Sequence, residues 1–198
     1  MARILVTGSE GFIGKHLIHA LHEHEVIGCD LGTKELTGPF DGIIHLAAVS
    51  RVRDAEIDRI KCLETNIVFT AQMLEWKPDW FIFSSTCEPP ENVYGFSKWT
   101  AEQYVELVAN KSVILKLTNV YGPGMAEDKL LPRLARGEIK KLNEGVLPFE
   151  HIHVKDVVAQ IVGFIPTFNE PCFKSFKMKL CTGIAKTQAE LLNVATSY

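Results

Sequence analysis

The 198-residue chain lacks the features that mark several large classes of protein. Its 21 lysines and arginines are outnumbered by 24 acidic residues, and the formal charge of −3 without a basic run argues against nucleic-acid or polybasic membrane binding. No apolar stretch approaches the roughly 20 residues that span a bilayer. Residues 1–3 lead directly into a strand pattern rather than a secretion signal. These absences predict a cytoplasmic protein without nucleic-acid or membrane partners.

Cysteine is too scattered for a disulfide framework or a zinc site. The five cysteines are odd in number and include no CxxC pair, so we expect reduced thiols. Several of the seven histidines lie between residues 16 and 24, but no cysteine or carboxylate set joins them at a metal-binding spacing. We therefore predict no metal site. The chain has no internal repeat or low-complexity linker, and its length suits one domain with a sizeable core.

A glycine-rich turn near the amino terminus is the strongest positive signal. Residues 3–6 form an apolar β-type run, and an amphipathic helical pattern begins at Ile13. Gly8 permits a tight turn off the strand, Gly11 lets backbone amides approach a pyrophosphate, and Gly14 allows close helix packing. A strand, a glycine-rich turn and a helix N-terminus together predict a dinucleotide site. An ordinary glycine-rich turn is the alternative.

The second predicted strand, residues 25–29, ends in an acidic residue. Asp30 lies 30 − 11 = 19 residues beyond Gly11, where a carboxylate accepts hydrogen bonds from an adenosine ribose. Because a 2′-phosphate would be repelled there, Asp30 favours NAD over NADP, although Lys34 brings a positive charge nearby. A turn-forming aspartate is the alternative.

Strand-like and helical patterns alternate along the rest of the chain, which predicts a doubly wound α/β domain around a parallel sheet. Ten residues separate Asp30 from Asp41, too few for a further strand and crossover helix, so the part of the sheet near the adenine is expected to be abbreviated. Ile57 and Ile60 are expected in the core. The expected strands cover residues 42–46, 80–86 and 113–117, with a further strand within residues 171–183. The expected helices cover residues 54–76, 94–109, 156–165 and 187–195.

A tyrosine and a lysine follow the strand at residues 80–86. If a helix begins near Tyr94, then Tyr94 and Lys98 are neighbours on one face. A tyrosine becomes a proton-transfer base when cations stabilise its phenolate, and Lys98 with an oxidised nicotinamide would supply them. A hydroxyl at the strand end, best matched by Thr86 with Ser84 and Ser85 as alternatives, would hold the substrate oxygen. A merely structural tyrosine–lysine pair is the other interpretation.

Taken in order, the motifs TGxxGFIG, HLAA, a hydroxyl-ended strand, YxxxK and NVYGPG resemble those of the extended short-chain dehydrogenase/reductases, in the NAD-dependent epimerase/dehydratase family. The resemblance covers nearly the whole chain. It implies a Rossmann-type sheet, NAD as cofactor, a nucleotide-sugar substrate, and catalytic roles for Tyr94, Lys98 and Thr86. Because the chain is short for this family, we expect a single domain, residues 1–198, with a reduced substrate lobe at about residues 125–150 and 166–198.

The resemblance also assigns residues along the crevice. Asn66 would meet the cofactor or brace the catalytic strand, and a polar bridge between core elements is the alternative. Asn119 would bind the nucleotide-sugar diphosphate, with a turn asparagine as the alternative. Glu88 matches the C5 base of sugar-nucleotide 4,6-dehydratases, although a solvated loop glutamate is favoured. The implied cofactor-binding residues are Gly8, Gly11, Phe12, Ile13, Gly14, Asp30, Leu31, Leu46, Ala47, Ala48, Asn66, Ser84, Tyr94 and Lys98.

The implied reaction begins with oxidation of a sugar hydroxyl, after which the ketone is reduced again by an epimerase or loses water in a dehydratase. Relatives dimerise through the helices that match residues 54–76 and 97–110, so a homodimer is expected. The alternatives are an NAD-binding regulatory or structural subunit without turnover, and an NAD(P)-dependent reductase of a non-sugar carbonyl. The sequence does not select the sugar or the nucleotide.

Overall fold

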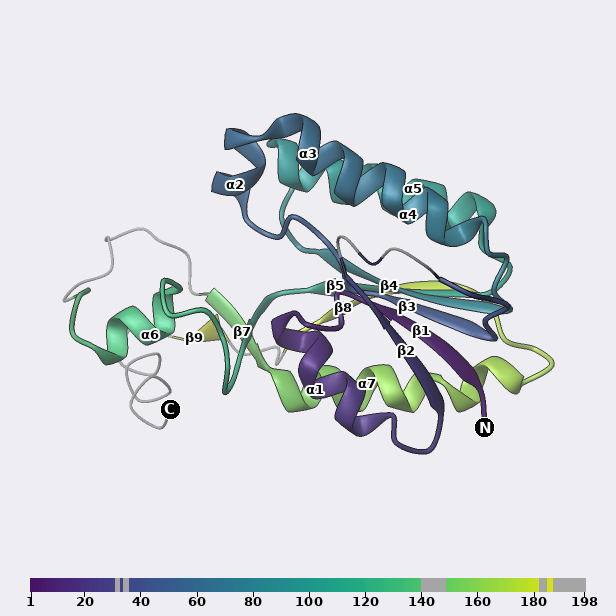
Figure 1. Cartoon of the computed structure of the whole chain (residues 1–198). Helices are drawn as coiled ribbons and strands as arrows, with labels where there is room; N and C mark the ends of the chain where they lie inside the picture. Colours follow the sequence, from purple (N-terminus) through teal and green to yellow (C-terminus); the bar gives the residue numbers. More distant parts are fainter. Residues whose placement is uncertain (31–32, 34–35, 140–148, 182–184, 187–198) are drawn as a thin grey trace.

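The computed structural model describes residues 1–30, 33, 36–139, 149–181 and 185–186. A six-stranded parallel sheet forms its centre, in the order β2-β1-β3-β4-β5-β8 (Figure 1). The order reverses between β1 and β3, which is where doubly wound sheets form a ligand crevice. The strands are β1 (Arg3–Thr7), β2 (Glu25–Cys29), β3 (Gly42–His45), β4 (Trp80–Thr86), β5 (Ser112–Leu117) and β8 (Phe176–Leu180).

Helices cover both faces of this sheet, so the predicted doubly wound fold is confirmed (Figure 1). On one face lie α1 (Phe12–Ala20) and α7 (Val154–Phe164). On the other lie α5 (Val93–Val108) and the helical segment of residues 52–74. None of the described helices has the length and hydrophobicity needed to cross a membrane. The first core includes Leu17, Leu21, Val157 and Ile161, and the second includes Met73, Phe81, Phe83 and Ala101.

The expected continuous helix over residues 54–76 is wrong. Asp58 interrupts it, because the Asp58 side chain accepts a hydrogen bond from Lys61 N and caps a new helix. The interruption leaves Ile57 and Ile60 77% and 66% exposed, so their predicted place in the core is also wrong. The segment consists of α2 (Val52–Ile57), α3 (Arg59–Leu63), the π-helical turn η1 (Glu64–Val68) and α4 (Phe69–Leu74).

The link between Asp30 and β3 is abbreviated, as expected. Its described residues, 33 and 36–40, form neither helix nor strand, and β2 is the edge of the sheet. Leu31 and Lys34, which the sequence placed near the cofactor, lie outside the described residues.

A small second sheet lies to one side of the main one, in the order β6-β7-β9, with α6 beside it (Figure 1). The sequence assigned residues 166–198 to the substrate lobe, but β8 instead pairs in parallel with β5, and Met178 and Leu180 join the main core. The predicted helix at residues 187–195 lies outside the described residues. The elements of this region are β6 (Asn119–Tyr121), α6 (Leu130–Ala135), β7 (Phe149–His153) and β9 (Ala185–Lys186).

Candidate cofactor and active site

The glycine-rich turn lies against the end of β3, at the reversal of strand order. Gly8 has a φ of +71°, and a Cβ atom there would lie 2.8 Å from Ala47 N. A Cβ atom on Gly14 would lie 2.1 Å from Gly8 O. Only glycine allows both approaches, and they leave the turn and the amino terminus of α1 as a cradle for a phosphate group. This cradle fits the pyrophosphate of a dinucleotide.

The other predicted residues of this cradle flank the same contact. Gly11 is the N-cap residue of α1, and Phe12 and Ile13 are its first helical residues. Leu46 and Ala48 lie on either side of Ala47, in the loop that follows β3. The structure therefore brings the described members of the predicted cofactor set from β1, α1 and β3 to one edge of the sheet.

Asp30 is fixed beside the turn by hydrogen bonds. Its Oδ2 atom accepts one from Ser9 Oγ at 2.5 Å and one from Glu10 N at 3.0 Å. Gly28 makes room for this arrangement, because a Cβ atom there would lie 2.7 Å from Ser9 Oγ. Sequence reasoning missed Ser9, although a hydroxyl inside the turn and an acid at the end of β2 were visible. The contacts hold a negative charge at the mouth of the cradle.

Thr86, Tyr94 and Lys98 meet at the carboxyl end of β4. Asn92 Oδ1 accepts a hydrogen bond from Gly95 N at 2.9 Å, which caps α5 and places Tyr94 in its first turn. The Thr86 hydroxyl lies near the Tyr94 phenol, close enough to affect its pKa. Burial raises the pKa of Tyr94, and the Thr86 hydroxyl acts in the opposite direction. Tyr94 therefore needs a nearby positive charge to act as a base near neutral pH.

Lys98 supplies a buried positive charge one helical turn after Tyr94. It is 2% exposed, and its Nζ atom lies 4.1 Å from the centroid of the Phe83 ring. Burial lowers the pKa of Lys98 to about 7, and the charges of Glu102 and Cys62 oppose this shift. An ammonium group that lies over an aromatic ring retains donors for ligand oxygens. It fits the ribose hydroxyls of a dinucleotide.

The neighbouring serines are occupied by other partners. Ser84 Oγ donates a hydrogen bond to His45 O at 3.0 Å, and Ser85 Oγ donates one to Glu102 Oε1. These bonds favour Thr86 over both serines as the hydroxyl that faces Tyr94.

Asn66 bridges two elements around the crevice. It is fully buried within η1, where its Oδ1 atom accepts from Val49 N at 2.8 Å. Its Nδ2 atom donates to Val49 O at 3.1 Å and to Ser97 Oγ at 2.8 Å. Ser97 Oγ in turn donates to Tyr94 O at 2.7 Å. Both amide hydrogens are used within the protein, which favours the bridging interpretation over a cofactor contact.

A buried histidine that sequence reasoning gave no role links the same elements. Thr70 Oγ1 donates to Asn66 O at 2.8 Å, so it accepts from His45 Nε2 at 2.9 Å. His45 Nδ1 then accepts from Thr7 Oγ1 at 2.7 Å. Burial, together with the nearby charge of Lys98, lowers the pKa of His45 to about 3. His45 is therefore a neutral connection between β1, β3 and α4.

Glu88 and Asn119, the two predicted substrate residues besides Thr86, are both exposed. Glu88 Oε1 accepts a hydrogen bond from Asn92 Nδ2 at 2.7 Å, and its backbone N–H donates to Thr86 Oγ1 at 3.1 Å. Asn119 begins β6 and pairs with His151 of β7 rather than lying in a turn. Both side chains are accessible to a ligand.

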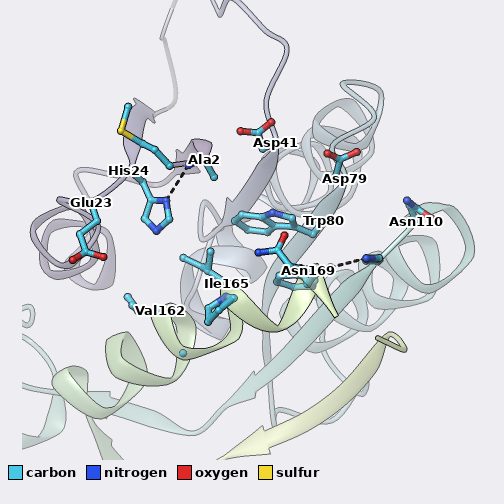
Figure 2. A pocket seen from close by; sticks show the side chains of 15 residues that line it. Ala2, Glu23, His24, Asp41, Asp79, Trp80, Asn110, Val162, Ile165 and Asn169 are labelled. Carbon is cyan, nitrogen blue, oxygen red and sulfur yellow. Dashed lines mark hydrogen bonds between the residues drawn. The ribbon is translucent and has the colours of Figure 1, made fainter. Parts of the chain in front are cut away.

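A cavity of about 960 Å³ lies at the opposite end of the sheet (Figure 2). Its lining includes Asp41 and Asp79, which precede β3 and β4, and Trp80, the first residue of β4. Ligands of doubly wound sheets bind at the carboxyl ends of the strands, so this cavity is separate from the crevice. No cluster of three potential metal ligands occurs in the described part of the chain.

Solved structures of nucleotide-sugar enzymes share this fold. MoeE5, in complex with UDP-glucose and NAD, is 22% identical with a TM-score of 0.83, over 98% of this chain and 81% of that one. The UDP-glucose 4-epimerase of the hyperthermophilic eubacterium Thermotoga maritima is 25% identical with a TM-score of 0.80, over 98% and 82%. TunA, an NAD-dependent NDP-hexosamine 5,6-dehydratase, is 22% identical with a TM-score of 0.81, over 100% and 81%.

A family model matches most of the chain directly. It covers residues 33–171, from the link before β3 to the segment after α7, and it includes Thr86, Tyr94 and Lys98. The glycine-rich turn lies before this stretch, and the contacts of Gly8 and Gly14 characterise it independently. The order of the sequence motifs, the fold of the chain and the match to the family model agree. The chain belongs to the NAD dependent epimerase/dehydratase family.

Proposed function

We propose that this chain is an NAD-dependent enzyme that epimerises or dehydrates a nucleotide sugar through transient oxidation of a sugar hydroxyl. The observation that carries the proposal is the buried Lys98 side chain one helical turn after Tyr94 on α5, next to the end of β4 that carries Thr86. NAD is the cofactor of the family. MoeE5 was solved with UDP-glucose and NAD, which supports a nucleotide sugar as the substrate class.

The chain's own residues divide into those that hold the cofactor and those that move a proton. Gly8, Gly11 and Gly14 would hold the pyrophosphate, Asp30 the adenosine ribose and Lys98 the nicotinamide ribose. When bound, NAD supplies the acceptor and the donor for a hydride.

At the reacting end, the Tyr94 oxygen accepts the proton of the sugar hydroxyl, while Thr86 Oγ1 donates a hydrogen bond to the same sugar oxygen. Burial raises the pKa of Tyr94, and we assign to the Lys98 charge the stabilisation of the Tyr94 phenolate during the reaction. In an epimerase, Tyr94 returns its proton when the ketone is reduced on the other face. In a dehydratase, Glu88 removes a proton next to the ketone and water leaves.

The small sheet with α6 is proposed as the reduced substrate lobe, within a single domain. Asn119 is exposed on β6, and we assign it to the diphosphate of the nucleotide sugar. All five cysteines are free, which supports a cytoplasmic location.

We also propose a homodimer formed through α2, α3 and α5. These helices lie side by side, and we assign their exposed apolar residues to the dimer surface. That surface includes Ile57, Ile60, Phe96 and Trp99.

The first prediction concerns the cofactor. Titration calorimetry should show NAD binding at least about tenfold more tightly than NADP, because the Asp30 carboxylate repels a 2′-phosphate. Asp30→Ala should remove most of this preference. Ser9→Ala keeps the charge and loses one hydrogen bond, so it should retain a larger part of the preference. Wild-type protein that binds NADP as tightly as NAD would overturn the assignment of Asp30.

The second prediction concerns the proton-transfer base. In a mass-spectrometric screen of UDP-, GDP- and dTDP-sugars, Tyr94→Phe should lower the rate by about 10²–10⁴ while NAD affinity stays unchanged. Tyr104→Phe, a matched change on the same helix, should retain activity. A loss below tenfold for Tyr94→Phe would assign the chemistry to another residue.

The same screen separates the reaction types. Glu88→Gln should make a dehydratase accumulate the 4-keto sugar and should leave an epimerase nearly unchanged. If the wild type binds NAD and turns over no sugar nucleotide, the enzyme proposal fails and the NAD-binding subunit takes its place. A non-sugar carbonyl that is reduced with NADH would favour the reductase alternative.

The third prediction follows from the burial of Lys98. Lys98→Met should raise the melting temperature of the cofactor-free protein at pH 6, because a buried ammonium without a bound carboxylate destabilises the fold. Between pH 7 and 9, Lys98 binds more protons in the unfolded chain than in the folded one, so the stability of the wild type rises with pH. The difference in melting temperature between Lys98→Met and the wild type should therefore narrow as the pH rises. The same variant should lose the thermal shift that NAD produces.

Scanning fluorimetry over this pH range provides the measurement, with Lys155→Met as the exposed-lysine control. A lower melting temperature for Lys98→Met at pH 6 would show that the ammonium stabilises the cofactor-free fold.

The fourth prediction concerns assembly. Light scattering should give a particle of twice the 22.1 kDa chain mass. Trp99→Glu places a charge among the exposed apolar residues of α5, so it should give monomers. Lys155→Glu, on α7 at the opposite face of the sheet, should leave the dimer intact. A monomeric wild type at micromolar concentration would refute the proposed interface.

A further inference from the structure

Glu102 is a buried carboxylate one helical turn beyond Lys98 on α5, with 1% of its surface exposed. Its Oε1 atom accepts a hydrogen bond from Ser85 Oγ and lies 3.7 Å from Lys116 Nζ. Its Oε2 atom lies 2.8 Å from Lys177 Nζ. One side chain of α5 therefore contacts β4, β5 and β8.

The strand register explains why these partners converge on one point. Ser85 of β4 lies opposite Lys116 of β5. Lys177 of β8 lies opposite Ile114, which is two residues before Lys116 and so on the same face. α5 covers this face of the sheet (Figure 1). The two ammonium groups therefore reach Glu102 from adjacent strands.

The charges of this cluster balance. Lys116 and Lys177 offset Glu102 and Glu106, whose Oε1 atom lies 3.1 Å from Lys177 Nζ. An apolar residue of similar volume would fill the space without the free-energy cost of burying a carboxylate. Packing alone therefore does not explain a charged residue at this position. The need for a negative charge near the active-site residue Lys98 explains it.

Glu102 follows Lys98 by four residues on α5, so the two side chains lie on one face of the helix. Burial lowers the pKa of Lys98, and among the described residues Glu102 is the carboxylate whose charge raises it. The charge of Cys62 from α3 acts on Lys98 in the same direction as that of Glu102. Lys98 lowers the pKa of the neutral His45 from β3. Tyr94 precedes Lys98 by one turn on α5. Because the pKa of Lys98 is about 7, a modest change in the local field decides whether it is charged at neutral pH.

We propose that Glu102 is a positioning residue for the active site, which joins β4, β5 and β8 to α5 and keeps the Lys98 ammonium charged. Glu102 holds Ser85, and so fixes the end of β4 that carries Thr86. Tyr94, Lys98 and Glu102 follow one another at four-residue intervals on α5. The inference rests on the proposed function, because it assigns Glu102 to the support of a proton-transfer pair that binds NAD.

The test compares four proteins with the wild type. Glu102→Gln removes the charge and keeps the shape, and Glu102→Asp keeps the charge. Glu106→Gln is the matched control, one turn further along the same helix. The double variant Glu102→Gln with Lys177→Met restores the charge balance of the cluster without restoring a negative charge near Lys98, so it also covers the case in which Glu102→Gln alone fails to fold.

Two readouts apply to each variant. The titration of Lys98 is followed by NMR with ¹³C-labelled lysine, assigned with Lys98→Met. NAD affinity is measured at pH 6 and pH 8. Glu102→Gln and the double variant should lower the Lys98 titration midpoint by about one pH unit. They should also weaken NAD binding about tenfold at pH 8 and only about twofold at pH 6. Glu102→Asp and Glu106→Gln should stay within about twofold of wild type.

An unchanged Lys98 midpoint in both variants that lack the charge would overturn the proposal. So would a double variant that binds NAD like the wild type at pH 8, because the role of Glu102 would then be structural. Neither readout depends on turnover. If the wild type binds NAD and converts no sugar nucleotide, the proposed enzyme fails while the Lys98 titration still decides the role of Glu102.

Discussion

The ammonium group of Lys98, held 4.1 Å over the Phe83 ring, sets the requirements for the polar residues around it. A second positive charge nearby would be costly, and His45 is kept neutral by burial between Thr7 and Thr70. A negative charge within one helical turn is favourable, and Glu102 supplies it. The neighbouring polar groups therefore all support one buried cation.

The same residues join separate elements into one support for the crevice. Asn66 connects the loop after β3 to α5, and the His45 chain connects β1 and β3 to α4. The side chains that make these hydrogen bonds are buried and use most of their donors within the network. Displacing one strand or helix would therefore leave buried polar groups without partners. The positions of Tyr94 and Lys98 relative to the glycine-rich turn follow from this network.

The sequence predicted those parts of the fold that are encoded by residues close together in the chain. The glycine-rich turn, the strands β2 and β4, and the Tyr94–Lys98 spacing are each visible within a few residues. The π-helical turn was not predicted, because Asn66 is held there by Val49 and Ser97, 17 and 31 residues away. For the same reason, β8 was assigned to the substrate lobe and not to the main sheet, since its partner strand β5 lies far from it in the sequence.

The shortened link between β2 and β3 lies at the edge of the sheet. β2 is the edge strand of the sheet that the described residues form, yet Asp30 at its end is held by Ser9 and Glu10 from the turn. The acid that would select the cofactor therefore depends on β1, β2 and the turn between β1 and α1, and not on any strand further out. A dinucleotide crevice needs the ends of β1, β2 and β3, and all three are present with their contacts intact. Loss of an outer unit is thus compatible with the chemistry of the family.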